Sequence, residues 1–173
     1  MFLVRPLKTI LVAILASFTL VSCSGPNKGD LLGSNAQVTI YYTKASDDLG
    51  VVLIPVLRAI DKKSGAYETA LKELFLGPTL DERERLKLNT EIPEGVRLIK
   101  IKETPNQVEI DISSQFMKGG GSETMQVRFR QLRETALNLA KGRPVYLYID
   151  GVKATTIGGE GLEVPQPLGS SLQ

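Results

Sequence analysis

Two carboxylates occupy alternate positions of one predicted strand, and their type and spacing come nearest to catalytic chemistry. Glu109 and Asp111 lie in the sequence VEIDIS, and alternate strand residues project from one face roughly 7 Å apart. That separation overlaps the one between the acid and the base of inverting glycosidases. A carboxylate-based cell-wall glycan hydrolase is therefore one hypothesis. A strand with one polar face produces the same pair without any reaction, and this interpretation is favoured, so we predict no catalytic residues.

Other reactive groups are scarce in this chain. It has no histidine, which removes the commonest general base and the commonest transition-metal ligand. No nucleophile elbow or phosphate-binding glycine motif occurs at a predicted strand-to-helix junction. Asp47 and Asp48 could belong to a calcium loop, but calcium takes about six to eight oxygens, and a solvated turn is favoured. The sequence predicts no metal, no cofactor and no enzymatic activity.

Cys23 is the single cysteine, and it follows a segment with the layout of an export signal. Two cations precede an uncharged run at residues 9–21, which is shorter than the roughly 20 apolar residues of a membrane span. The sequence LVSC, ending at Cys23, resembles the lipobox at which bacterial lipoproteins are acylated and cleaved. We expect residues 1–22 to be a signal peptide and residues 23–36 a flexible tether. Acylated Cys23 would then hold the chain in the lipid bilayer, on the extracytoplasmic side of the inner or the outer membrane.

The charge of the chain argues against nucleic acid as a partner. There are 21 basic and 19 acidic residues, and two of the cations lie in the predicted signal, so the remainder is balanced. Nucleic-acid binding depends on an excess of cations that neutralise phosphates. Arg128, Arg130 and Arg133 are spread around a predicted helix and are interpreted as solvated. We therefore expect no nucleic-acid partner.

The elements that position these residues begin with two strands and a helix. Val38, Ile40 and Tyr42 alternate with polar residues, as on a half-buried strand. Residues 51–60 form an apolar run that contains Pro55, which lacks an N–H group, so we predict an edge strand that could accept a strand of a partner. The sequence SGAYETALKELFLGPT places its apolar residues on one helical stripe and ends with glycine and proline. A capping box, TLDE, then predicts a short helix.

The second half of the chain repeats strand, strand and helix, and ends with another strand. Strands are predicted at residues 96–102 and 107–113, with Glu109 and Asp111 on a wet face and both helices covering the other face. Ser122 is expected to cap the next helix, and PVYLYIDG to form the last strand with a closing turn. The order of elements favours an α+β fold, with a mostly antiparallel or mixed sheet of about five strands and two helices packed on one face.

Tyrosines are the natural residues for binding, because they combine apolar area with a polar tip. On each strand that carries two tyrosines, one is expected to lie in the core. The predicted interaction surface consists of Tyr41, Tyr146, Tyr148, Glu109 and Asp111.

Four sequence blocks together resemble the GerMN family of sporulation and spore-germination domains. They are ALKELFLGPT, IPEG, VEIDISSQF and YLYIDG, in this order within residues 37–168, with residues 169–173 as a tail. The resemblance implies a fold like the ring-building motif of secretion machines, an extracytoplasmic location and no known catalytic residues. It favours an envelope scaffold or adaptor that contacts an envelope protein or peptidoglycan, and that forms a homo- or hetero-oligomer.

Overall fold

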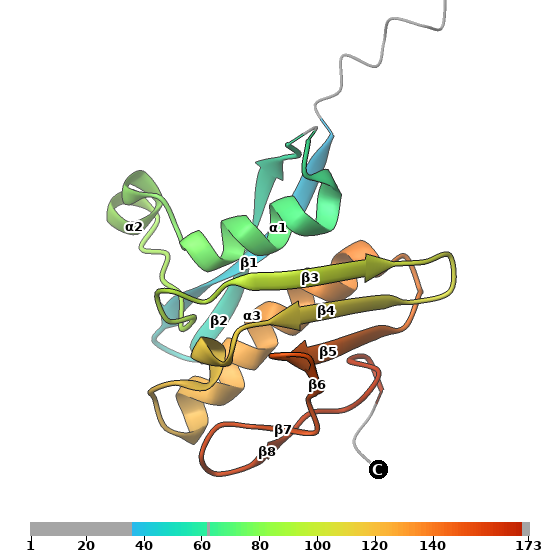
Figure 1. Cartoon of the computed structure of the whole chain (residues 1–173). Coiled ribbons are helices and arrows are strands. Elements are labelled where there is room, and N and C mark those ends of the chain that lie inside the picture. Colours follow the sequence, from blue (N-terminus) through green and yellow to red (C-terminus); the bar gives the residue numbers. More distant parts are fainter. Residues whose placement is uncertain (1–35, 62, 171–173) are drawn as a thin grey trace, which may run out of the picture. The chain divides into compact units, whose positions relative to one another are not determined.

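The computed structural model describes residues 36–61 and 63–170 of the chain. The predicted signal peptide, Cys23 and the predicted tether up to Asn35 lie outside these residues. Figure 1 shows the five longer strands and the three α-helices of the described residues in the order in which the sequence predicts them, whereas one 3₁₀ helix and three two-residue strands were not predicted. The elements are β1 (Gln37–Ser46), β2 (Gly50–Ala59), α1 (Gly65–Leu76), α2 (Leu80–Arg85), β3 (Leu98–Glu103), β4 (Val108–Ile112), the 3₁₀ helix η1 (Ser114–Met117), α3 (Ser122–Ala140), β5 (Val145–Ile149), β6 (Val152–Lys153), β7 (Thr156–Ile157) and β8 (Leu162–Glu163).

The main sheet is mixed and has the strand order β3-β4-β5-β6. β4 pairs antiparallel with β3 and parallel with β5, and β6 returns antiparallel beside β5. α3 provides the crossover between the parallel strands β4 and β5 (Figure 1). The predicted α+β class and the mixed sheet are therefore confirmed. β1 and β2 instead pair only with each other in a separate antiparallel hairpin, as do the short β7 and β8.

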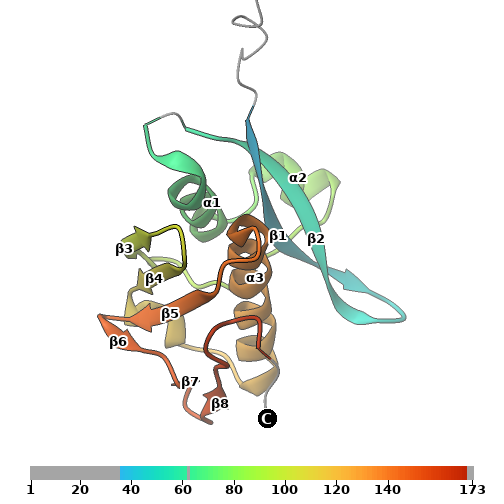
Figure 2. The same ribbon diagram turned by 90° about the vertical axis from the view of Figure 1, so that its right-hand side faces the viewer.

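α1 and α3 form the middle layer of this domain. Figure 2 shows them between the main sheet on one side and the β1–β2 hairpin on the other. The buried core includes Leu71 and Leu74 from α1, Leu132 from α3, and Ile110 and Leu147 from the sheet. Each helix is thus covered on two sides. It buries more of its surface than a helix that packs on the core through a single apolar stripe. None of the helices in the described residues is long and apolar enough to cross a membrane.

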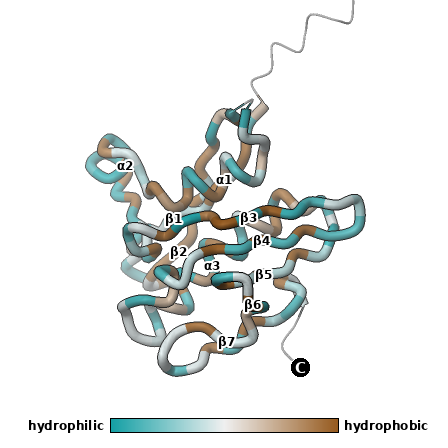
Figure 3. The backbone as a smooth tube through the Cα atoms, viewed as in Figure 1, coloured by the Kyte–Doolittle hydropathy of each residue, from teal (hydrophilic) through white to brown (hydrophobic). Residues whose placement is uncertain are grey.

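Alternating burial along the strands agrees with the alternation in the sequence. Val108, Ile110 and Ile112 of β4 are fully buried beneath the helices, whereas the residues between them are half-buried on the opposite face. The same period of two appears in β1 and β5, and the hydropathy colours of Figure 3 follow it along these strands. One face of the main sheet is therefore dry and the other faces solvent, as predicted.

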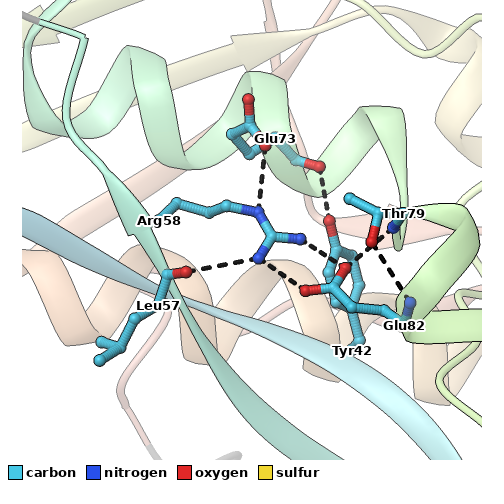
Figure 4. A network of polar contacts seen from close by, with 6 residues as sticks. All are labelled: Tyr42, Leu57, Arg58, Glu73, Thr79 and Glu82. Carbon is cyan, nitrogen blue, oxygen red and sulfur yellow. Dashed lines mark hydrogen bonds and ion pairs between the residues drawn. The ribbon is translucent and has the colours of Figure 1, made fainter. Parts of the chain in front are cut away.

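A network of charged side chains holds α2, which buries no residue of its own. Arg58 of β2 makes a bidentate pair with Glu82 of α2, at 2.8 and 2.7 Å, and donates to Glu73 of α1 at 3.1 Å (Figure 4). The predicted capping box is present, because Thr79 and Glu82 each accept a hydrogen bond from the other's backbone N–H. Tyr42 of β1 donates to the Glu73 carbonyl at 2.8 Å, and burial raises the pKa of Tyr42 to about 12. The network therefore ties β1, β2, α1 and α2 together.

Two expectations for α3 are wrong. Ser122 is the first helical residue and not the cap, since Gly121 occupies the N-cap position without a side-chain hydrogen bond. Arg128 is buried, with 3% of its surface exposed, and not solvated. Its guanidinium donates to the carbonyls of Glu91, Phe116, Lys118 and Gly119, at 2.7 to 3.1 Å. Burial lowers the pKa of Arg128, and the four carbonyls compensate its charge.

Candidate interaction face of the mixed sheet

Four of the five residues predicted for the interaction surface lie together on the solvent-facing side of the main sheet. The strand register arranges them in two rows across the sheet. One row contains Lys102, Glu109 and Tyr146, and the other contains Lys100, Asp111, Tyr148 and Lys153. We call these seven residues the open sheet face. The sequence alone identifies the β4 and β5 members by their period of two, whereas the lysines require the register of β3 and β6.

The two carboxylates of the open sheet face already have partners within the domain. Asp111 Oδ1 accepts the Gly151 N–H at 3.0 Å, which fixes the two-residue turn between β5 and β6. Asp150 and Gly151 of this turn have φ values of 47° and 79°, as expected for the Asp-Gly hairpin turn predicted from the sequence. Glu109 Oε1 lies 3.5 Å from Lys102 Nζ and accepts a hydrogen bond from Gln107. Each carboxylate therefore has a structural contact that explains its position.

Tyr146 and Tyr148 are both half-buried on the open sheet face. The expectation that one of them lies in the core is wrong, since residues two apart on a strand share a face. Lys153 Nζ lies 4.5 Å from the centroid of the Tyr146 ring, a distance at which the cation attracts the ring face. On β1 the expectation holds, because Tyr42 is fully buried and Tyr41 is only half-buried. Tyr41 lies on the β1–β2 hairpin, apart from the other four residues.

The open sheet face contains a shallow hollow of about 230 Å³. It is lined by Lys100, Lys102, Glu109, Asp111, Tyr148 and Gly151. This volume is smaller than the roughly 300 Å³ at which closed small-molecule pockets begin. Within the residues that the structure describes, no three His, Cys, Asp or Glu side chains gather as they would around a metal ion.

A larger hollow of about 440 Å³ lies where α3 begins. The loops at residues 119–121 and 157–160 line it, together with Met117, Met125 and Leu162. Gly119 and Gly120 have φ values of 70° and 81°, a region that favours glycine. Arg128 holds this loop through the carbonyls of Lys118 and Gly119. The sequence does not identify the buried arginine that fixes this loop.

The fold and the open sheet face together define an α+β domain with a solvated mixed sheet and a helix pair behind it. A family described as Germane, sporulation and spore germination, matches residues 39–155. The chain belongs to this GerMN family. The resemblance found in the four sequence blocks is therefore confirmed. No curated protein sequence matches the chain.

Two solved structures share the fold. The first GerMN domain of the sporulation protein GerM from Bacillus subtilis is 15% identical, with a TM-score of 0.57, over 75% of this chain and 95% of that one. The tandem GerMN domains of the same protein are 22% identical, with a TM-score of 0.53, over 75% of this chain and 44% of that one. This chain thus matches less than half of the tandem-domain chain. At these identities the likeness establishes the fold alone.

Proposed function

We propose that this chain is a non-catalytic adaptor of the cell envelope, anchored to a membrane through Cys23, whose open sheet face binds an envelope protein or peptidoglycan. The observation that carries the proposal is the open sheet face itself. Two half-exposed tyrosines, three lysines and two carboxylates lie side by side on strands whose other face packs on the core. Aromatic side chains with polar tips beside charged groups are typical of binding surfaces.

The contacts of the carboxylates favour binding over hydrolysis. A glycan hydrolase would use Glu109 and Asp111 as acid and base. Both carboxylates lie on an open hollow, and each already accepts a hydrogen bond from its own domain. General acid catalysis depends on a group that is free to transfer its proton to the substrate. Structural roles for both carboxylates therefore agree better with an adaptor.

Photocrosslinking in cells tests the binding role. A photoreactive amino acid in place of Tyr146, which lies beside Glu109 on the open sheet face, is expected to capture an envelope protein or wall glycan. The matched control carries the same amino acid in place of Tyr41, which lies on the hairpin and not on the open sheet face. Equal capture of the same product from both positions would show that the open sheet face is not the binding surface.

A second experiment tests the hydrolase alternative. The purified chain is incubated with cell-wall glycan, and the soluble fragments are measured. We expect no release above that of buffer. Asp111→Asn retains an oxygen that can accept the Gly151 N–H, so this variant should fold normally. Fragment release that Asp111→Asn abolishes would refute the adaptor proposal.

A further inference from the structure

The three longest strands in the described part of the chain, β1, β2 and β3, differ in how far their free edges are protected from pairing with another strand. β1 pairs with β2 on one side, and its other edge is covered. The Tyr41 N–H donates to Thr135 Oγ1 at 3.2 Å, and the Tyr41 carbonyl accepts from Gln131 Nε2 at 3.1 Å. Two residues on, Thr43 exchanges two backbone hydrogen bonds of 2.8 Å with Asn89. The outer edge of β1 is therefore covered at Tyr41 and Thr43.

β3 is an edge strand that carries features known to discourage pairing. Its register with β4 is irregular between Leu98 and Lys100, so that Ile99 is an extra residue in the strand. Lys100 and Lys102 are exposed beside this bulge. Bulges and lysines are common means by which proteins protect a sheet edge from other chains.

The outer edge of β2 has neither a bulge nor a lysine, and Pro55 is the one residue on it of a type that discourages pairing. The backbone N–H and C=O groups of Tyr41 and Thr43 point away from β2. In an antiparallel pair, the residues opposite such positions also point their backbone groups away from the partner strand. The residues opposite are Pro55 and Leu53, so their backbone groups point away from β1. Pro55 fits this edge, since its missing N–H would point outward. Val51, Leu57 and Ala59 follow the same alternation. β2 thus presents a ladder of outward backbone groups along its ten residues.

The side chains beside this ladder are apolar. Leu57 is 59% exposed and Leu53 is half-buried on the outer face of the hairpin. Arg58 is the one charged residue of β2, and it points to Glu73 and Glu82. Its Nη1 also donates to the Leu57 carbonyl at 3.3 Å (Figure 4), and that oxygen keeps a second lone pair for a partner strand. The contacts of Arg58 with Glu73 and Glu82 join β2 to α1 and α2. The edge of β2 is therefore already extended in the single chain, which lowers the entropy cost of pairing.

We propose that β2 pairs antiparallel with β2 of a second copy of this chain, about a two-fold axis at Pro55. In this register Leu53 lies opposite Leu57 of the second copy, and Val51 lies opposite Ala59. The outward groups can then form about eight hydrogen bonds between the chains, and only the Pro55 pair forms none. A shift by two residues in either direction leaves about six, because the ladder shortens and each proline still lacks a donor.

The symmetry of β2 is what favours a second copy over a foreign strand. The leucines are spaced equally on either side of Pro55, so each covers its counterpart across the axis. The outward-facing residues of β2 carry no charge, so they provide no electrostatic preference for a strand of another protein. An isologous pairing also uses both exposed edges at once and cannot continue into a fibre. The two hairpins would join into one four-stranded antiparallel sheet, a form of β-augmentation.

Disulfide crosslinking of the full chain in its membranes tests the pairing and is independent of what the open sheet face binds. Pro55→Cys places the thiol on the axis, and a mild oxidant should yield a product of twice the mass of one chain. Leu57→Cys alone puts its two Cα atoms roughly 14 Å apart, beyond the reach of a disulfide of about 7 Å. We expect at least about tenfold more dimer with Pro55→Cys than with Leu57→Cys.

Two further variants keep the test decisive. Leu53→Cys with Leu57→Cys should restore the dimer, since these residues are opposite each other in the proposed register. Val152→Cys, at an exposed position on β6, and the unsubstituted chain give the background from surface thiols and from Cys23. Failure of both Pro55→Cys and the double variant to exceed this background would overturn the proposal. A crosslinked product of any other mass, or equal dimer with Leu57→Cys, would overturn it as well.

Discussion

Arg128 shows how one buried cation can organise loops that are distant in the sequence. Its guanidinium joins the carbonyl of Glu91, which follows α2, to those of Phe116, Lys118 and Gly119, which precede α3. A planar group with five donors in a fixed fork can serve several carbonyls at once. Arg128 therefore holds the loop before α3 from within, by donating to its carbonyls.

We expect Arg128→Met to destabilise the domain by about 2 to 4 kcal/mol, because it leaves the buried Phe116 carbonyl and three partly buried carbonyls without this donor. Arg130→Met, at an exposed position of the same helix, is the matched control and should change stability by less than about 0.5 kcal/mol. Urea unfolding followed by circular dichroism measures both variants. Similar losses from the two would mean that the carbonyl contacts of Arg128 contribute nothing specific.

At the scale of elements, α2 remains in place through charge and not through apolar burial. The Arg58–Glu82 pair joins α2 to β2, and the side chains of the two residues are 15% and 13% exposed. The hydrogen bonds from Arg58 hold the pKa of Glu82 below its ordinary value of 4.5. A carboxyl with a lowered pKa in the folded state stabilises that state above pH 4.5, and this contribution is lost as the pH falls through the lowered pKa.

We therefore predict that Glu82→Gln lowers the free energy of unfolding by about 1 to 2 kcal/mol at pH 7. The difference from the unsubstituted chain should shrink steadily below pH 4.5, where Glu82 becomes protonated in the unfolded state and then in the folded state. Asp81→Asn is the control, since its pair with Arg85 is exposed and should contribute less than about 1 kcal/mol. Unfolding curves between pH 3 and 7 measure the effect, and a difference that does not depend on pH would contradict it.

The sequence predicts the helices and strands more reliably than it predicts the contacts between residues that are distant in the chain. The period of two in β4 places Glu109 and Asp111 correctly, and the Thr79–Glu82 capping box forms as expected. Arg128 is misplaced because the loops around Glu91 and residues 116–119 cover it, and a helical stripe describes only the side of α3 that packs on the core. The partners of Arg128 are carbonyls between 9 and 37 residues away, and local periodicity contains no information about them.

At the scale of the whole molecule, the layer order separates the two proposed surfaces. The open sheet face lies on one side of the helix layer, and the β2 edge belongs to the hairpin on the other side (Figure 2). Pairing through β2 would therefore leave two open sheet faces free in each dimer. Two linked binding faces hold a repetitive or membrane-confined partner more firmly than one, because the second contact forms at a high effective concentration. Modest affinity at each face would be sufficient for an adaptor.

An adaptor of this kind depends on its anchor, and Cys23 is the residue proposed to provide it. A single acyl chain gives only weak and reversible membrane binding, whereas several chains on one residue hold the protein firmly. We predict that Cys23→Ala abolishes incorporation of a labelled fatty acid and leaves a soluble or unprocessed chain. Ser24→Ala, at the next residue, should retain the label. Membrane fractionation and intact-mass analysis provide the measurements, and a processed Cys23→Ala chain that stays with the membrane would show that something other than a lipid on this cysteine holds the domain there.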